Sequence, residues 1–146
     1  MSRVVAFDWG LARIGVAVSD PTRTLATPHV VISEKDKGQQ IKKCVALVRE
    51  LEAEVVLVGL PVHLDGGTSQ STLTAERFTA ALERGLAAAG LTPELHRVDE
   101  RWSSVEAETR LREGGHRRVG RGGVAVDAAA AAVTLQAWLD RQAGAR

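Results

Sequence analysis

The chain has very little cysteine and no long apolar run, and both shortages restrict what it can be. Its one cysteine, Cys44, cannot form an internal disulfide, and we expect it to be a small buried hydrophobe on a helix. No apolar stretch approaches the roughly 20 residues of a membrane span. The N-terminal residues also lack the successive charged, apolar and small-residue regions of a signal peptide. We therefore expect a cytoplasmic protein.

An excess of charge of one sign is also missing. Nineteen Lys and Arg residues oppose 18 Asp and Glu residues, and the net charge of +1 by itself says nothing about a nucleic-acid partner. The 146 residues are 45% hydrophobic and 25% charged, which is typical of a globular protein. No repeat, low-complexity tract or linker divides them, so we expect a single domain over residues 1–146.

Histidines and cysteines with the spacing of metal ligands are absent as well. His63, His96 and His116 show no such spacing, so the sequence does not predict a zinc site. His116 lies inside the segment RLREGGHRRVGR, residues 110–121, where five arginines accompany one acid. This segment is a candidate clamp for phosphates, and a solvated surface loop explains it equally well at this point.

The first part of the chain predicts three strands joined by short connections. Continuous apolar runs occupy Val4–Phe7 and Ile14–Val18, and a third candidate strand follows at Pro28–Ile32. Parallel neighbours need about a dozen connecting residues or more, so the first three strands should be antiparallel.

The rest of the chain alternates helical and extended patterns. Apolar residues at helical spacing over 37–54 predict an amphipathic helix. The later elements are a strand over Val55–Pro61, a helix from about Ser69 to Ala89 with Leu73, Leu82 and Leu86 inside and Gly90 at its end, a strand over Pro93–Glu100, a helix opened by the Ser103 and Glu106 capping box, and a final helix over 124–142. This order predicts an α/β fold with a five-stranded mixed sheet flanked by helices.

Three acids lie at the ends of these elements. Asp8 ends the first strand, Glu100 ends the last strand, and Asp127 is near the start of the final helix. Each alone has an ordinary explanation as a turn residue, a solvated strand end or an acid near a helix N-terminus. Together they would need a cation, because unpaired clustered carboxylates are costly to bury.

The chemistry of this set favours a hard metal ion. Carboxylate oxygens without thiolates or paired imidazoles select Mg²⁺ or Mn²⁺. Such ions on a carboxylate cage support the hydrolysis of phosphodiester bonds. The arginine segment would then hold phosphates near the site without reading sequence.

Four blocks of the sequence together resemble one family. They are FDWGLARIGVAVSD, LVGLPVHLDGG, VDERWSSVEAE and DAAAAAVTLQAWLD, and they run from the first strand to the final helix. In this order they resemble the YqgF, or RuvX, family of bacterial nucleases with a ribonuclease H-like fold. The resemblance implies that Asp8, Glu100 and Asp127 are the metal-binding catalytic set. It also implies either resolution of four-way DNA junctions or processing of the 5′ end of the precursor of 16S ribosomal RNA.

Several residues near these acids are candidates for holding the substrate. The family pattern D-x-G-x-K-R-x-G has Leu11 and Ala12 in its middle here, and Arg13 alone keeps the charge. Further candidates for nucleic-acid contact are Arg101, Trp102, Ser103, His116, Arg117, Arg118 and Arg121. Arg13 and Arg101 could instead pair with neighbouring acids, and Ser103 could serve only as a helix cap.

Two other classes of function remain as alternatives. A non-catalytic nucleic-acid-binding module of the same fold is one, although all three acids are present. An actin-like or sugar-kinase ATPase lobe is the other, and it would need a second lobe. Resolution of a symmetric junction needs two matched cuts, so we also expect a homodimer.

Overall fold

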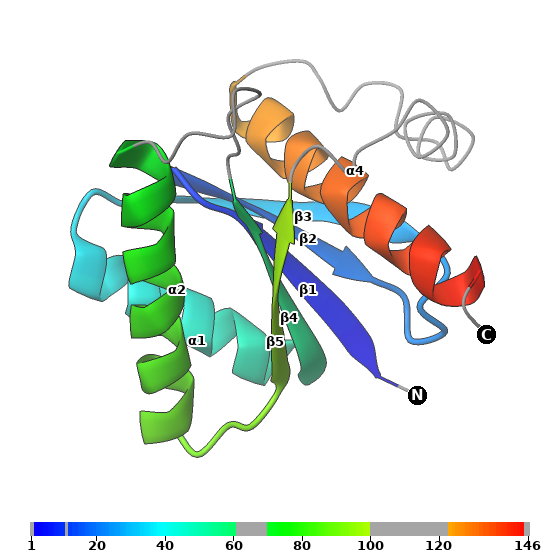
Figure 1. The fold of residues 1–146 in the computed structure, drawn as a ribbon, viewed down its shortest axis with the longest axis horizontal. Helices are drawn as coiled ribbons and strands as arrows, with labels where there is room; N and C mark the ends of the chain where they lie inside the picture. Colours follow the sequence, from blue (N-terminus) through cyan, green and yellow to red (C-terminus); the bar gives the residue numbers. More distant parts are fainter. Residues whose placement is uncertain (1, 11, 61–69, 100–122, 145–146) are drawn as a thin grey trace.

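The computed structural model describes residues 2–10, 12–60, 70–99 and 123–144, which form one sheet with helices on both faces (Figure 1). The strands are β1 (Arg3–Asp8), β2 (Arg13–Ser19), β3 (Ala26–Ser33), β4 (Ala53–Leu60) and β5 (Glu94–Asp99). The described helices are α1 (Lys37–Glu50), α2 (Gln70–Ala88) and α4 (Gly123–Gly144). The strand order is β3-β2-β1-β4-β5, so β1 is central.

The strand pairings confirm the mixed sheet expected from the sequence. β1 pairs antiparallel with β2, and β2 pairs antiparallel with β3. β1 pairs parallel with β4, and β4 pairs parallel with β5. The two parallel connections contain α1 and α2, as crossovers between parallel strands require. Consequently β1, β4 and β5 all end at the same edge of the sheet, where α2 and α4 begin (Figure 1).

Alternation along the strands separates two apolar layers. One layer lies between the sheet and α4, and it contains Val4, Ala6, Ala17, Val55, Leu57 and Val98 from the strands with Ala131, Ala132, Leu135, Trp138 and Leu139 from α4. The other layer lies under α1 and α2, and it contains Val5, Phe7, Ile14, Val16, Val56 and Val58 with Cys44, Val48, Phe78, Leu82 and Leu86. The even-numbered residues of β1 therefore face α4, and the odd-numbered ones face α1 and α2.

The side chains of α1 and α2 are not all placed as expected. Leu73 lies within the span of α2 as expected, but its side chain is 45% exposed, so it is not part of the buried face of the helix. The buried stripe of α2 runs through Ala75, Phe78, Leu82 and Leu86, and Leu73 lies two residues before it, on the opposite side of the helix. Gln40 of α1 is buried because its side-chain amide donates to the carbonyl oxygen of Glu34.

The helix ends follow their local sequence. The Asp36 carboxylate caps α1 by accepting the N–H of Gln39 at 2.8 Å. After α2, Gly90 has a φ of +77°, the left-handed conformation that terminates helices, which confirms its predicted role. Cys44 is fully buried as expected, and this burial raises the pKa of its thiol.

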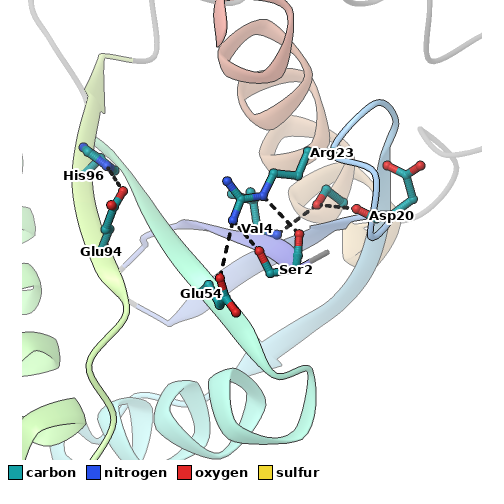
Figure 2. Close-up of polar contacts among 8 residues, drawn as sticks. Ser2, Val4, Asp20, Arg23, Glu54, Glu94 and His96 are labelled. Atoms are coloured by element: carbon teal, nitrogen blue, oxygen red, sulfur yellow. Dashed lines mark hydrogen bonds and ion pairs between the residues drawn. The ribbon is translucent and has the colours of Figure 1, made fainter. Parts of the chain in front are cut away.

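Polar contacts hold the start of β1 in place (Figure 2). They lie at the opposite end of the sheet from the ends of β1, β4 and β5. The backbone N–H of Val4 donates to the Ser19 hydroxyl at 2.9 Å, and that hydroxyl donates to the Asp20 carbonyl oxygen at 2.9 Å. Arg23 donates to the carbonyl oxygen of Ser2 at 3.0 Å and lies 4.0 Å from the carboxylate of Glu54. These contacts join β1, β4 and the β2–β3 connection.

A buried glutamine fastens α4 to the same connection. Gln136 is 1% exposed, and its amide oxygen accepts the N–H of Ala26 at 2.9 Å. Its amide nitrogen donates to the Thr24 carbonyl oxygen and to the Asp140 carboxylate, both at 3.0 Å. The position of α4 over β2 and β3 is thus set by hydrogen bonds as well as by apolar packing. None of the described helices is long and apolar enough to cross a membrane.

Candidate active site

Asp8 ends the central strand on the face that α4 covers. Its neighbours across the sheet are Gly15 of β2 and Gly59 of β4, which are its register partners. Residues directly opposite each other on adjacent strands lie only about 5 Å apart. Because both register partners are glycines, no side chain stands directly opposite the half-buried Asp8 on either neighbouring strand.

Asp127 is brought to this position by α4. A Cβ atom at Gly15 would lie 2.0 Å from the Asp127 carbonyl oxygen and 2.5 Å from its carbonyl carbon. The helix backbone therefore rests directly on the strand residue that pairs with Asp8. Asp127 is the fifth residue of α4, where the span expected from the sequence made it the fourth, so its predicted place near the start of the helix is confirmed.

Arg13 lies on the same face, two residues before Gly15 in β2. Its Nε atom is 3.3 Å from Oδ2 of Asp127, and the two side chains are 54% and 32% exposed. The expected cation next to the acids is therefore present in an ion pair. More than half of the Arg13 side chain still reaches solvent, so it can also meet an anion that approaches the site.

One oxygen of Asp127 is suited to an additional cation. Oδ2 is shielded from solvent, and apart from its ion pair with Arg13 it has no hydrogen-bond partner among the described residues. Buried carboxylate oxygens almost always have a partner. A hard divalent cation takes oxygen ligands of this kind, so the donor set fits Mg²⁺ or Mn²⁺.

The remaining predicted site residues lie outside the described residues. Glu100 is the next residue after Asp99, the last residue of β5. The others are Arg101, Trp102, Ser103, His116, Arg117, Arg118 and Arg121. In the described part of the chain, no group of three His, Cys, Asp or Glu side chains is placed to hold a metal. Of the three predicted acids, the structure thus brings together the regions of Asp8 and Asp127.

Gly15 and Gly59 were not singled out from the sequence, although each is needed to understand the site. Gly15 stands at the end of the D-x-G-x-x-R-x-G pattern, and Gly59 lies inside the most hydrophobic strand. A glycine inside a strand commonly marks the close approach of another backbone. That signal was available for Gly15, but the sequence does not tell which segment approaches it.

The family of the chain follows from comparison with known sequences. The family model described as "RuvX: Holliday junction resolvase" matches residues 2–141. The chain belongs to the RuvX nuclease family. Its curated relatives include a protein of Anaeromyxobacter sp. (strain Fw109-5), 42% identical over 139 residues, which span 94% of this chain and 96% of the relative. This relative is named "Putative pre-16S rRNA nuclease".

A second relative agrees with this membership, and two solved structures share the fold. A protein of Mycobacterium tuberculosis (strain ATCC 25618 / H37Rv) with the same name is 39% identical over 143 residues, covering 98% of this chain and 81% of the relative. T. thermophilus RuvC, in complex with a Holliday junction substrate, has a TM-score of 0.68 at 13% identity, covering 99% of this chain and 97% of that one. The yeast mitochondrial resolvase Ydc2 has a TM-score of 0.64 at 15% identity, with coverages of 97% and 79%. The RuvX chain therefore has the RuvC-like ribonuclease H fold, as expected.

Proposed function

We propose that this RuvX chain is a metal-dependent endonuclease that hydrolyses phosphodiester bonds in structured nucleic acid. The observation that carries the proposal is the contact of the Asp127 backbone with Gly15, the strand partner of Asp8. This contact unites the first and last acidic blocks of the sequence on one face of the sheet. The proposed set of metal ligands and catalytic residues is Asp8, Glu100 and Asp127.

Mg²⁺ or Mn²⁺ held by these carboxylates would activate a water molecule and stabilise the leaving oxygen of a phosphodiester. Asp8 and Asp127 contribute fixed positions, since one ends a central strand and the other is held by helix packing. Arg13 contributes a cation beside Asp127 that is exposed enough to meet a phosphate.

The proposed substrate is the precursor of 16S ribosomal RNA, cut at its 5′ end. The names of relatives about 40% identical over nearly the whole chain support this choice. The residues proposed to hold the RNA are Arg13, Arg101, Trp102, Ser103, His116, Arg117, Arg118 and Arg121.

Four-way DNA junctions are a second candidate substrate, favoured by the description of the matching family model. Two matched cuts in a symmetric junction require two active sites, so this function goes with a homodimer. Sedimentation with and without a junction tests the dimer, and a monomer under both conditions would count against junction resolution.

The deciding experiment is a cleavage assay on both substrates with Mg²⁺ and with Mn²⁺. Purified Asp8→Asn and Asp127→Asn should lose cleavage while they still bind the nucleic acid, because the amide keeps the shape of the side chain and removes its charge. Asp36→Asn is the matched control, since asparagine also caps a helix well. It should cut like the unmodified protein.

The outcomes separate the alternatives clearly. Full cleavage by both Asp8→Asn and Asp127→Asn would show that the assigned site is wrong. If the unmodified protein binds nucleic acid but cuts neither substrate with Mg²⁺ or with Mn²⁺, the result would instead favour the non-catalytic binding module. Preference for RNA or for the junction decides between the two substrates.

A further inference from the structure

A cavity lies beside the end of β1, on the face of the sheet that α1 and α2 cover and that faces away from α4. It has a volume of about 180 Å³ and is lined by Trp9, by the first turn of α1 and by the middle of α2. Trp9 directly follows Asp8, and successive strand residues point to opposite faces. One lining residue is therefore the chain neighbour of the proposed catalytic Asp8, but the cavity lies on the other face of the sheet. The helices α1 and α2 cover that face (Figure 1).

The lining of the cavity is aromatic and aliphatic. The rings of Trp9 and Phe78 have centroids 6.2 Å apart and planes tilted by 35°, and Ile41 and Ala81 complete the apolar wall. A dry cavity of about 150 Å³ is large enough to hold benzene. The space beside Trp9 thus suits one planar ring system.

Two cations line the same cavity, Lys37 of α1 and Arg77 of α2. Neither forms an ion pair or hydrogen bond among the described residues. Two neighbouring cations are paired, since Lys43 lies 3.0 Å from Glu34 and Arg97 lies 2.8 Å from Glu76. Lys37 and Arg77 are therefore available to an anion.

We propose that this cavity binds one unpaired nucleotide of the nucleic-acid substrate, a few nucleotides from the bond that is cut. The base enters the apolar space against Trp9, while Lys37 and Arg77 contact the adjoining phosphates. A flat apolar ring with negative charges beside it is the chemistry of a nucleotide, and aromatic stacking with flanking cations is how single strands are held. The inference rests on the proposed function, since it takes the occupant to be the substrate.

The test measures binding of a labelled single-stranded oligonucleotide by fluorescence anisotropy, with a chelator present to prevent cleavage. Lys37→Gln combined with Arg77→Gln should reduce the salt dependence of binding, by about 0.7 in the logarithmic slope for each lost phosphate contact. Lys42→Gln combined with Arg84→Gln removes the same charge from exposed positions on the same helices outside this cavity. This control pair should leave the slope nearly unchanged.

A second variant tests the cavity without a change in charge. Ala81→Leu fills part of the space and should weaken binding about tenfold, as expected for the loss of one stacked base. Ala87→Leu adds the same side chain at an exposed position of α2 and should bind normally. An oligonucleotide of abasic residues should bind the Ala81→Leu variant and the unmodified protein with the same affinity, because it has no base to place in the cavity.

The possible results decide the matter for this site. If both cavity variants bind like their controls, the cavity does not hold a nucleotide, whatever the Asp8→Asn assay shows. If the Ala81→Leu defect is equally large on the abasic oligonucleotide, no base enters the cavity and the inference is wrong. Full cleavage by both Asp8→Asn and Asp127→Asn would overturn the proposed catalytic site and leave these binding results unaffected.

Discussion

The carbonyl oxygen of Asp127 occupies the position that a side chain at residue 15 would need. A Cβ atom at Gly15 would approach this oxygen to 2.0 Å, far closer than atoms can pack. Glycine at position 15 is thus a requirement of the site, because it allows α4 to bring its acid to the strand partner of Asp8.

Gly15→Ala should damage both stability and activity. The added methyl group must push the helix backbone away, and overpacking of this kind costs about 1–3 kcal/mol of unfolding free energy. Misplacement of a catalytic group by about 1 Å can lower the rate about 100-fold. Urea unfolding and cleavage assays should show both losses, whereas Gly144→Ala, where a Cβ atom meets nothing within 4 Å, should show neither.

Arg13→Gln should separate stability from function. The ion pair with Asp127 is partly exposed, so its loss should change the unfolding free energy by less than about 1 kcal/mol. Removal of a cation beside Asp127 should also tighten binding of Mg²⁺, as measured by calorimetry, and weaken nucleic-acid binding. Unchanged affinities for both Mg²⁺ and nucleic acid would show that Arg13 has only a structural role.

Gln136→Met should destabilise the fold strongly, although methionine and glutamine are similar in size. It leaves the N–H of Ala26 and the carbonyl oxygen of Thr24 without their partner. Each unsatisfied buried group costs about 1–3 kcal/mol, so we expect a loss of about 2–4 kcal/mol in urea unfolding. Gln142→Met on the exposed part of α4 should stay within about 0.5 kcal/mol of the unmodified protein.

Asp20 should make the stability depend on pH. Partial burial opposes its ionisation, but hydrogen bonds from the Thr22 hydroxyl and from the N–H groups of Leu25 and Thr24 outweigh this and lower its pKa below the ordinary value of 3.8. A lowered pKa in the folded state gives stability that is present above pH 3.8 and lost as the pH falls through the folded pKa.

Asp20→Asn should therefore be less stable than the unmodified protein at pH 7, by less than about 1 kcal/mol because the turn is largely exposed. The difference should shrink as the pH is lowered below 3.8. A difference that stays constant from pH 7 to pH 2.5 would show that the charge of Asp20 has no part in it.

The local features of the fold were predictable because their causes are local. The sequence predicted all five strands, most of them from apolar runs, and Gly90 marked the end of α2. The exposure of the Leu73 side chain was not foreseen, because several apolar residues on a helix can define more than one apolar stripe. The burial of Gln40 depends on its contact with Glu34, and a helical pattern does not show such a contact.

The site was predictable as a set of residue types and not as a packing arrangement. The positions of Asp8 and Asp127 at the ends of elements, together with the family resemblance, indicated them as partners, and the structure places their regions on one face. The contact between Gly15 and the α4 backbone joins distant parts of the chain, so no local pattern could reveal it. Glu100 and the arginine segment lie outside the described residues, and their roles stay predictions.

The dependence of the site on α4 has a consequence for the timing of activity. Asp8 is made more than 100 residues before Asp127 and the rest of α4, which holds Asp127 over β2. Chains emerge from the ribosome at about 5–20 residues per second and fold as domains. By the proposed function, a growing chain should therefore be unable to cut nucleic acid until α4 has been made and has docked on the sheet.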